Sequence, residues 1–229
     1  MRQAIPVKSP IRRCPVSSAW QKRPILALAA SFAAMLAGVL CLNAAVPSTA
    51  QTPAQVSLAG QFLVAAPSMG DPRFERTVIL MAGHDPNGAF GFVINRPVGE
   101  RAVSDLLEML GGEKDATVTA KVPIFYGGPV QPELAFVIHS SDYRRAQTLA
   151  IDGRVAVTSS REVLRDIGGD KGPKNSLVTF GYAGWRPGQI EGELRARAWV
   201  TAPADPRLIF EENREKLWDA AFALRTQDL

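Results

Sequence analysis

An uncharged apolar run near the start of the chain divides the sequence into two parts that cannot share one fold. Residues 25–42 read ILALAASFAAMLAGVLCL, eighteen positions without a charge. Six Lys or Arg side chains and no acid precede this run, and Ser48-Thr49-Ala50 follows it with the small-x-small spacing of a cleavage site. This order of segments predicts a secretory signal peptide over residues 1–50.

The apolar run also has nearly the length of a membrane anchor. Eighteen residues at about 1.5 Å each approach the roughly 30 Å of a bilayer core, but the many alanines make the run weakly apolar, which favours cleavage. Because the basic end stays in the cytoplasm, we expect a periplasmic domain, either released by cleavage near Ala50 or tethered to the inner membrane through an uncleaved segment. If translation starts downstream of the leader, the protein is cytoplasmic.

The part of the chain after the leader is slightly acidic. Of the 26 basic side chains, six lie in residues 1–50, which leaves 20 against all 22 acidic ones and a formal net charge of −2 for residues 51–229. Nucleic-acid-binding domains present basic surfaces that neutralise phosphates, and no run of Lys and Arg offers one here. We therefore expect no tight nucleic-acid binding, and a small molecule or a protein as the partner.

The few residues suited to metal or nucleophilic chemistry are poorly placed for it. Both cysteines, Cys14 and Cys41, lie in the leader, so residues 51–229 can form no disulfide, thiolate metal site or cysteine nucleophile. The two histidines, His84 and His139, each end an apolar stretch, and neither belongs to a metal-binding spacing such as H-E-x-x-H. No G-x-S-x-G nucleophile elbow occurs. The sequence predicts no metal and no cofactor, and it identifies no catalytic residues.

Short apolar stretches separated by turn signals predict a single α+β domain over residues 59–229, after a linker at residues 51–58. Asn87-Gly88 between two such stretches predicts a hairpin, because both residues tolerate positive φ. Strands outnumber helices without a regular strand–helix repeat, which argues against a doubly wound sheet. The expected strands are 62–66, 78–82, 90–94, 124–126, 135–139, 155–158, 177–180 and 198–201. The expected helices are 105–110 capped by Ser104, one capped by Ser159 with Glu162 that ends before Gly168-Gly169, and 211–224.

Four segments, in this order, resemble the YqgE/AlgH family, and the resemblance runs from about residue 58 to residue 224. It implies an α+β domain whose sheet curls into a partial barrel with a few flanking helices. Members carry a transcriptional-regulator label, without an established cofactor or catalytic set. They typically lack an export signal, so the leader departs from the family pattern. The four segments are GQFLVAAPSMGDPRF at 60–74, GFVINRP at 91–97, FYGGPV at 125–130 and GYAGWRPGQ at 181–189.

The same segments hold the candidates for a ligand site, which we expect to converge on one face. Polar side chains at the ends of strands could bind a ligand, a guanidinium holding a carboxylate or phosphate, or they could serve their own turns. The glycines permit a close backbone approach, either by a ligand or by another strand. A tryptophan and a glutamine could cover a pocket or pack in the core. The candidates are Asp71, Arg76, Asn95, Arg96, Gly127, Gly128, Trp185 and Gln189.

Together these observations favour an exported, non-enzymatic binding or regulatory domain. One alternative is an enzyme of unassigned chemistry with a polar site around Asp71, Asn95 and Arg96. Another is a cytoplasmic transcriptional regulator, if the leader is not used.

Overall fold

The computed structural model describes residues 56–113, 118–210 and 213–226. The expected signal or anchor segment, residues 1–50, and linker residues 51–55 lie outside the described residues. Within the described ranges, no helix is both long and apolar enough to cross a bilayer.

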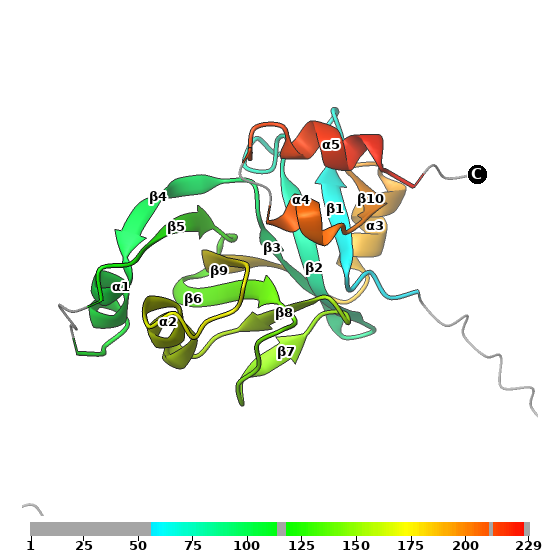
Figure 1. Cartoon of the computed structure of the whole chain (residues 1–229). Coiled ribbons are helices and arrows are strands. Elements are labelled where there is room, and N and C mark those ends of the chain that lie inside the picture. Colours follow the sequence, from blue (N-terminus) through cyan, green and yellow to red (C-terminus); the bar gives the residue numbers. More distant parts are fainter. Residues whose placement is uncertain (1–55, 114–117, 211–212, 227–229) are drawn as a thin grey trace, which may run out of the picture. The chain divides into compact units, whose positions relative to one another are not determined.

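In the part of the chain that the structure describes, ten strands form a strongly curled, mostly antiparallel sheet (Figure 1). Eight of them follow the order β10-β1-β2-β3-β9-β6-β8-β7, while β5 pairs with β4 on one side and runs parallel to β9 on the other. The first and last strands therefore pair with each other at one edge of the sheet. The strands are β1 Gln61–Ala65, β2 Val78–Asp85, β3 Gly88–Val93, β4 Pro97–Ala102, β5 Lys121–Tyr126, β6 Val130–Ser140, β7 Thr148–Ala150, β8 Val155–Thr158, β9 Ser176–Trp185 and β10 Trp199–Pro203.

Across residues 56–113, 118–210 and 213–226, five short helices pack against the sheet in separate places. One cluster of buried side chains surrounds α1 and α2, another lies beside α3, and the third lies beneath α4 and α5. The helices are α1 Val103–Met109, α2 Arg161–Gly168, α3 Gln189–Arg195, α4 Pro206–Ile209 and α5 Leu217–Ala223.

Strand β1 shows why both faces of the sheet need covering. Its side chains alternate between faces. Phe62 and Val64 belong to the cluster beneath α4 and α5, whereas Leu63 and Ala65 belong to the cluster beside α3. Because β1 is apolar at every one of these positions, neither face can be left to water.

The predicted α+β class and the curled sheet are confirmed, and every expected strand and helix corresponds to an observed one. Strand 155–158 is confirmed at both ends. Strands β4 and β7 and helices α3 and α4 were not predicted. The first five residues of β4, Pro97–Arg101, are exposed, so it has no apolar face for a sequence pattern to reveal.

Three helix starts differ from expectation. Ser104 does not cap α1 but lies inside it, buried, and the residue before the helix is Ala102. The residue before α2 is Ser160 rather than Ser159. The last helix begins at Leu217 rather than at 211, and residues 211–212 lie outside the described range.

Candidate functional site

Asn95 and Arg96 fasten the loop between β1 and β2 to the end of β3. The Asn95 side chain accepts a hydrogen bond from the Val78 amide at 2.9 Å and donates one to the Arg76 carbonyl at 2.8 Å. Arg96 Nη2 donates to the carbonyl of Glu75 at 2.9 Å. Both side chains therefore meet backbone groups of the chain itself.

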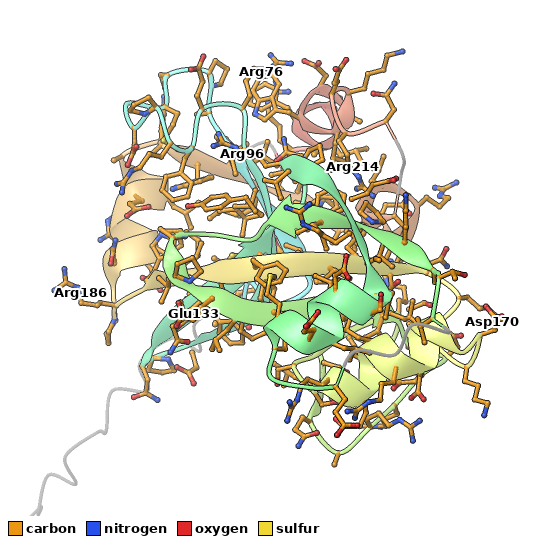
Figure 2. All side chains as sticks on the ribbon, turned by 90° about the vertical axis from the view of Figure 1, so that its left-hand side faces the viewer. Arg76, Arg96, Glu133, Asp170, Arg186 and Arg214 are labelled. Atoms are coloured by element: carbon orange, nitrogen blue, oxygen red, sulfur yellow. The ribbon has the colours of Figure 1, made fainter. Side chains whose placement is uncertain are left out.

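Arg76 lies in the same region and turns toward α5. Its guanidinium pairs with Asp219 at 2.8 Å and stacks over Trp218, 4.2 Å from the ring. Figure 2 shows Arg76 and Arg96 near one another at this end of the domain, with Arg186 well apart from them. The structure thus brings Arg76, Asn95 and Arg96 together.

Asp71, Trp185 and Gln189 line a second place, a cavity of about 400 Å³ between the β1–β2 loop, the end of β9 and α3. Asp71 is paired with Arg73 at 2.7 Å, and these hydrogen bonds lower the pKa of its carboxyl group. Glu193 lies between the aromatic side chains of the cavity. It accepts hydrogen bonds from the indole nitrogens of Trp185 at 3.0 Å and Trp199 at 2.8 Å, and from Gln189 at 3.0 Å.

Gly127 and Gly128 lie against the backbone of β9. A Cβ atom at position 127 would come within 2.3 Å of the Gly181 carbonyl oxygen, and one at position 128 within 2.1 Å of the Tyr182 carbonyl carbon. These contacts account for both glycines as requirements of strand packing. The eight candidates thus fall into three groups with separate neighbours, and ligand binding by any of them stays a prediction.

A groove of about 1100 Å³ runs along β3, β9 and β6. Its floor is formed by Phe90, Phe92, Phe136 and Tyr182, and we call it the aromatic groove. Neighbouring rings in this set lie 5.1 to 6.3 Å apart and pack edge to face or tilted, the arrangement that aromatic quadrupoles favour. Phe90, Phe136 and Tyr182 are only partly buried, so apolar ring surface remains open to a ligand.

Local sequence explains how the rings reach one side of the sheet. Phe90 and Phe92 are two apart on β3 and so share a face. The neighbouring strand β9 supplies Tyr182, and β6 supplies Phe136. A bulge in β2 places Gly83 beneath Phe90, where an added Cβ would lie 2.4 Å from the ring. Gly83 thus leaves room for the Phe90 ring.

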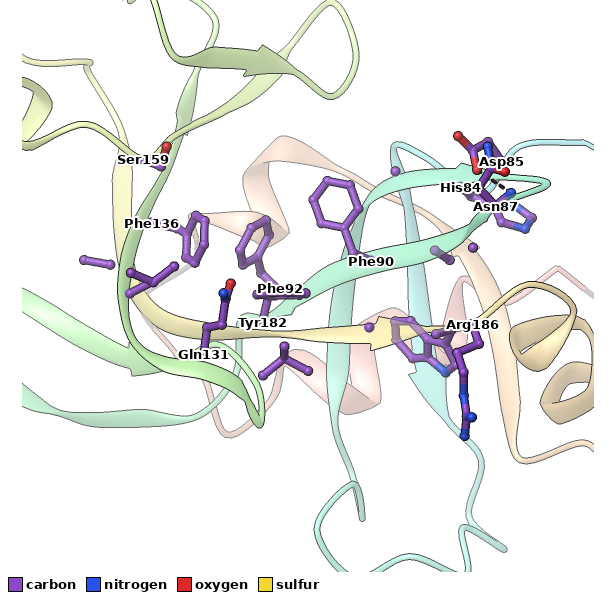
Figure 3. A pocket seen from close by; sticks show the side chains of 18 of the residues that line it. His84, Asp85, Asn87, Phe90, Phe92, Gln131, Phe136, Ser159, Tyr182 and Arg186 are labelled. Carbon is purple, nitrogen blue, oxygen red and sulfur yellow. Dashed lines mark hydrogen bonds between the residues drawn. The ribbon is translucent and has the colours of Figure 1, made fainter. Parts of the chain in front are cut away.

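The two ends of the aromatic groove differ in chemistry, as Figure 3 shows. At one end is the β2–β3 hairpin with His84, Asp85 and Asn87, and Arg186 lines the groove nearby. At the other end, beside Phe136, is Ser159, and Arg161, two residues further along the chain, also lines the groove. Arg161 Nη1 donates to the carbonyl of Leu110 at 3.0 Å.

His84 has its ring held on both sides. Nδ1 accepts a hydrogen bond from the Leu58 amide at 3.1 Å, so the ring proton is on Nε2, which donates to Glu191 at 2.8 Å. Burial acts to raise the pKa of Glu191, but the His84 hydrogen bond and others outweigh it, so the pKa is lowered overall. Glu191 and Glu193 thus face different partners from the same helix, as expected for positions two apart.

His139, the other histidine, lies fully buried between strands. Its Nδ1 donates to the carbonyl of Ser140 at 2.9 Å, so Nε2 accepts from the hydroxyl of Thr158 at 2.9 Å. The hydroxyl of Thr158 lies 2.7 Å from that of Thr148, which connects β6, β8 and β7. Burial lowers the pKa of His139, which keeps the imidazole neutral.

Sequence reasoning missed the aromatic groove. Phe90 and Phe136 were interpreted as members of apolar strands, which they are, but alternation alone cannot tell a ring in the core from one lining an open groove. The available signal was Phe90-x-Phe92 following Gly83, because a glycine opposite an aromatic residue marks a crowded face.

The chemistry of the aromatic groove suits binding. Within the described ranges, no three His, Cys, Asp or Glu side chains gather as metal ligands would. The groove presents apolar rings with polar groups only at its ends, which is the composition of a small-molecule binding site.

Comparison with known proteins gives one consistent family. Residues 62–229 match the family model described as AlgH-like, DUF179. A UPF0301 protein of Jannaschia sp. (strain CCS1) is 44% identical over 166 residues, covering 72% of this chain and 86% of that protein. A UPF0301 protein of Pseudomonas putida (strain GB-1) is 44% identical over 164 residues, covering 71% of this chain and 86% of the relative.

Solved structures agree. The solution structure of the AlgH protein from Pseudomonas aeruginosa is 40% identical, covers 74% of this chain and 89% of its own, and superposes with a TM-score of 0.65. A crystal structure from Corynebacterium diphtheriae, 22% identical with a TM-score of 0.56 over 70% of this chain and 83% of its own, shares the fold. The resemblance seen in four short segments is confirmed, and this chain belongs to the AlgH-like family, DUF179/UPF0301.

Proposed function

We propose that this chain is an exported, non-enzymatic binding domain that holds a small apolar ligand in the aromatic groove. The observation that carries the proposal is the set of partly open rings, Phe90, Phe136 and Tyr182, at the floor of a cavity of about 1100 Å³. Small-molecule sites typically have volumes of roughly 300–1000 Å³ and apolar walls with a few polar groups.

The polar candidate residues already have hydrogen-bond or ion-pair partners within the protein, which favours binding over catalysis. Asn95 and Arg96 hydrogen-bond the chain's own backbone, and Asp71 is paired with Arg73. An enzyme centred on these three residues would have to break those contacts before it met a substrate. The net charge of −2 over residues 51–229 favours a ligand other than nucleic acid. Export is supported by the leader, with its basic start, apolar run and small-x-small site.

A groove-filling substitution tests the proposal. Gly184 lines the groove on β9, opposite Phe90 and two residues from Tyr182, so Gly184→Phe should place a ring where a ligand would lie. We expect the protein to bind the uncharged fluorophore N-phenyl-1-naphthylamine, and Gly184→Phe to weaken binding by about tenfold or more, equivalent to about 1.4 kcal/mol.

Gly153→Phe, between β7 and β8, is the matched control, because position 153 is exposed, has open space around it and lies outside the groove. It should bind like the unmodified protein, and thermal unfolding should show that both variants are folded. A protein that never enhances the fluorescence, or a Gly184→Phe variant that binds normally, would contradict the proposal.

A further inference from the structure

The ionisable side chains around the aromatic groove are unevenly distributed. At the hairpin end, Asp85 and Arg186 both line the groove, so their formal charges cancel. Asp85 is the only acid among the described residues that line the groove, and its carboxylate accepts a hydrogen bond from the Asn87 amide at 2.7 Å. At the other end, Arg161 and Ser159 line the groove, and no acid lines it there in the part of the chain that the structure describes. One end is therefore neutral and the other cationic.

The cationic end has hydrogen-bond donors that the described part of the protein does not use. One guanidinium nitrogen of Arg161 meets the Leu110 carbonyl, and the planar group carries further N–H donors. Within the described part of the chain, the Ser159 hydroxyl has no hydrogen-bond partner. The next acid along α2, Glu162, faces Arg165 at 3.9 Å and does not line the groove. Among the described residues, no carboxylate of the groove therefore pairs with the Arg161 guanidinium or the Ser159 hydroxyl.

Apolar floor and cationic end adjoin one another. Figure 3 shows Ser159 close to Phe136, and the labelled aromatic residues continue from Phe136 toward Phe90 and the hairpin. A ligand with an apolar body and one charged end could satisfy both parts at once. An arginine suits such an end well, because its fork of donors matches carboxylate and phosphate oxygens.

Building on the proposed function, we infer that the ligand of the aromatic groove is a monomeric amphipathic anion. Its carboxylate or phosphate head lies at Ser159 and Arg161, and its apolar body lies along the rings from Phe136 to Phe90. The ligand enters as a single molecule, because the rings form the floor of a cavity and do not project from the surface.

A set of probes that share one chain and differ only in head group tests this inference. Decanoate, decan-1-ol and decyltrimethylammonium are titrated against the protein by displacement of N-phenyl-1-naphthylamine. Decanoate should bind about tenfold more tightly than decan-1-ol, with the cation weakest, since hydrogen bonds to charged groups exceed neutral ones by roughly that factor. Because the cationic end is exposed, the preference should shrink as salt is raised.

Two arginines on α2 provide matched variants. Arg161→Gln should lower decanoate affinity about tenfold, to the level of decan-1-ol, and leave decan-1-ol binding unchanged. Arg165→Gln, four residues along the same helix and outside the groove, should leave both probes unchanged. Arg161→Lys should restore part of the preference for decanoate, because it keeps the charge but not the fork.

The outcomes separate the inference from the proposed function. If all three probes bind equally, the inference is overturned while the binding function stands. The same holds if Arg165→Gln weakens decanoate as much as Arg161→Gln does, or if the protein sediments with anionic lipid vesicles but prefers no anionic monomer. If no probe displaces the fluorophore and the fluorophore itself does not bind, the proposed function fails too.

Discussion

Asn95 matters through the backbone groups that it joins. Replacing it with Ala removes the acceptor for the Val78 amide and the donor to the Arg76 carbonyl. A partly buried polar group left without its partner costs about 1–3 kcal/mol, so Asn95→Ala should lower the free energy of unfolding by that amount. Arg96→Ala, which loses an exposed bond, should cost less than about 1 kcal/mol. Urea unfolding of the two variants measures both, and equal losses would contradict this division.

His139 should make stability depend on pH. Burial puts its folded pKa below the unfolded value of about 6.5, so the unfolded chain binds the proton more readily. The contribution of the neutral His139 to the free energy of unfolding should therefore be fully present above that pH and should decrease as the pH falls below it. His139→Gln cannot take up the proton, so its unfolding free energy should vary less between about pH 7.5 and pH 5.5. Parallel curves for the two proteins would assign the slope to other groups.

At the scale of elements, α3 is tied to the sheet through one carboxylate. Glu193 accepts from the indoles of Trp185 on β9 and Trp199 on β10. Glu193→Ala leaves two buried indole N–H groups without a partner and should cost about 2 kcal/mol or more. Glu193→Gln keeps an acceptor oxygen and should cost less than half as much. Chemical unfolding followed by tryptophan fluorescence distinguishes them, and equal costs would mean that packing, not hydrogen bonding, holds α3.

How far the sequence predicts these elements depends on how much of each is buried. Strand β8 is apolar or β-branched throughout and fully buried, so pattern alone locates both its ends. Strand β4 is exposed at its first five residues and is held by pairing with β5, which no local pattern reveals. The same limit applies to the site. Asn95 stands out in the sequence as a polar strand end, but its partner at Val78 is 17 residues away.

At the scale of the whole molecule, the leader predicts where the protein resides. We expect a mature form beginning near Gln51 in the periplasm, because a basic segment, an apolar run and a small-x-small site precede that residue. Fractionation of cells that make the full chain with a C-terminal tag, followed by sequencing of the new N-terminus, measures both. A soluble cytoplasmic protein that starts after the leader would refute this expectation.

The pairing of β1 with β10 determines how early in synthesis the sheet can be completed. Ala65 lies opposite Trp199, so the first strand of the sheet has one of its two neighbours near the end of the chain. Such distant pairings carry a large loop-closure entropy and make folding slow, on the order of milliseconds to seconds. A ribosome adds about 5–20 residues per second, so β1 waits several seconds for β10 to be made. Throughout that interval the nascent chain cannot complete its core, a condition compatible with the proposed export through a translocation channel.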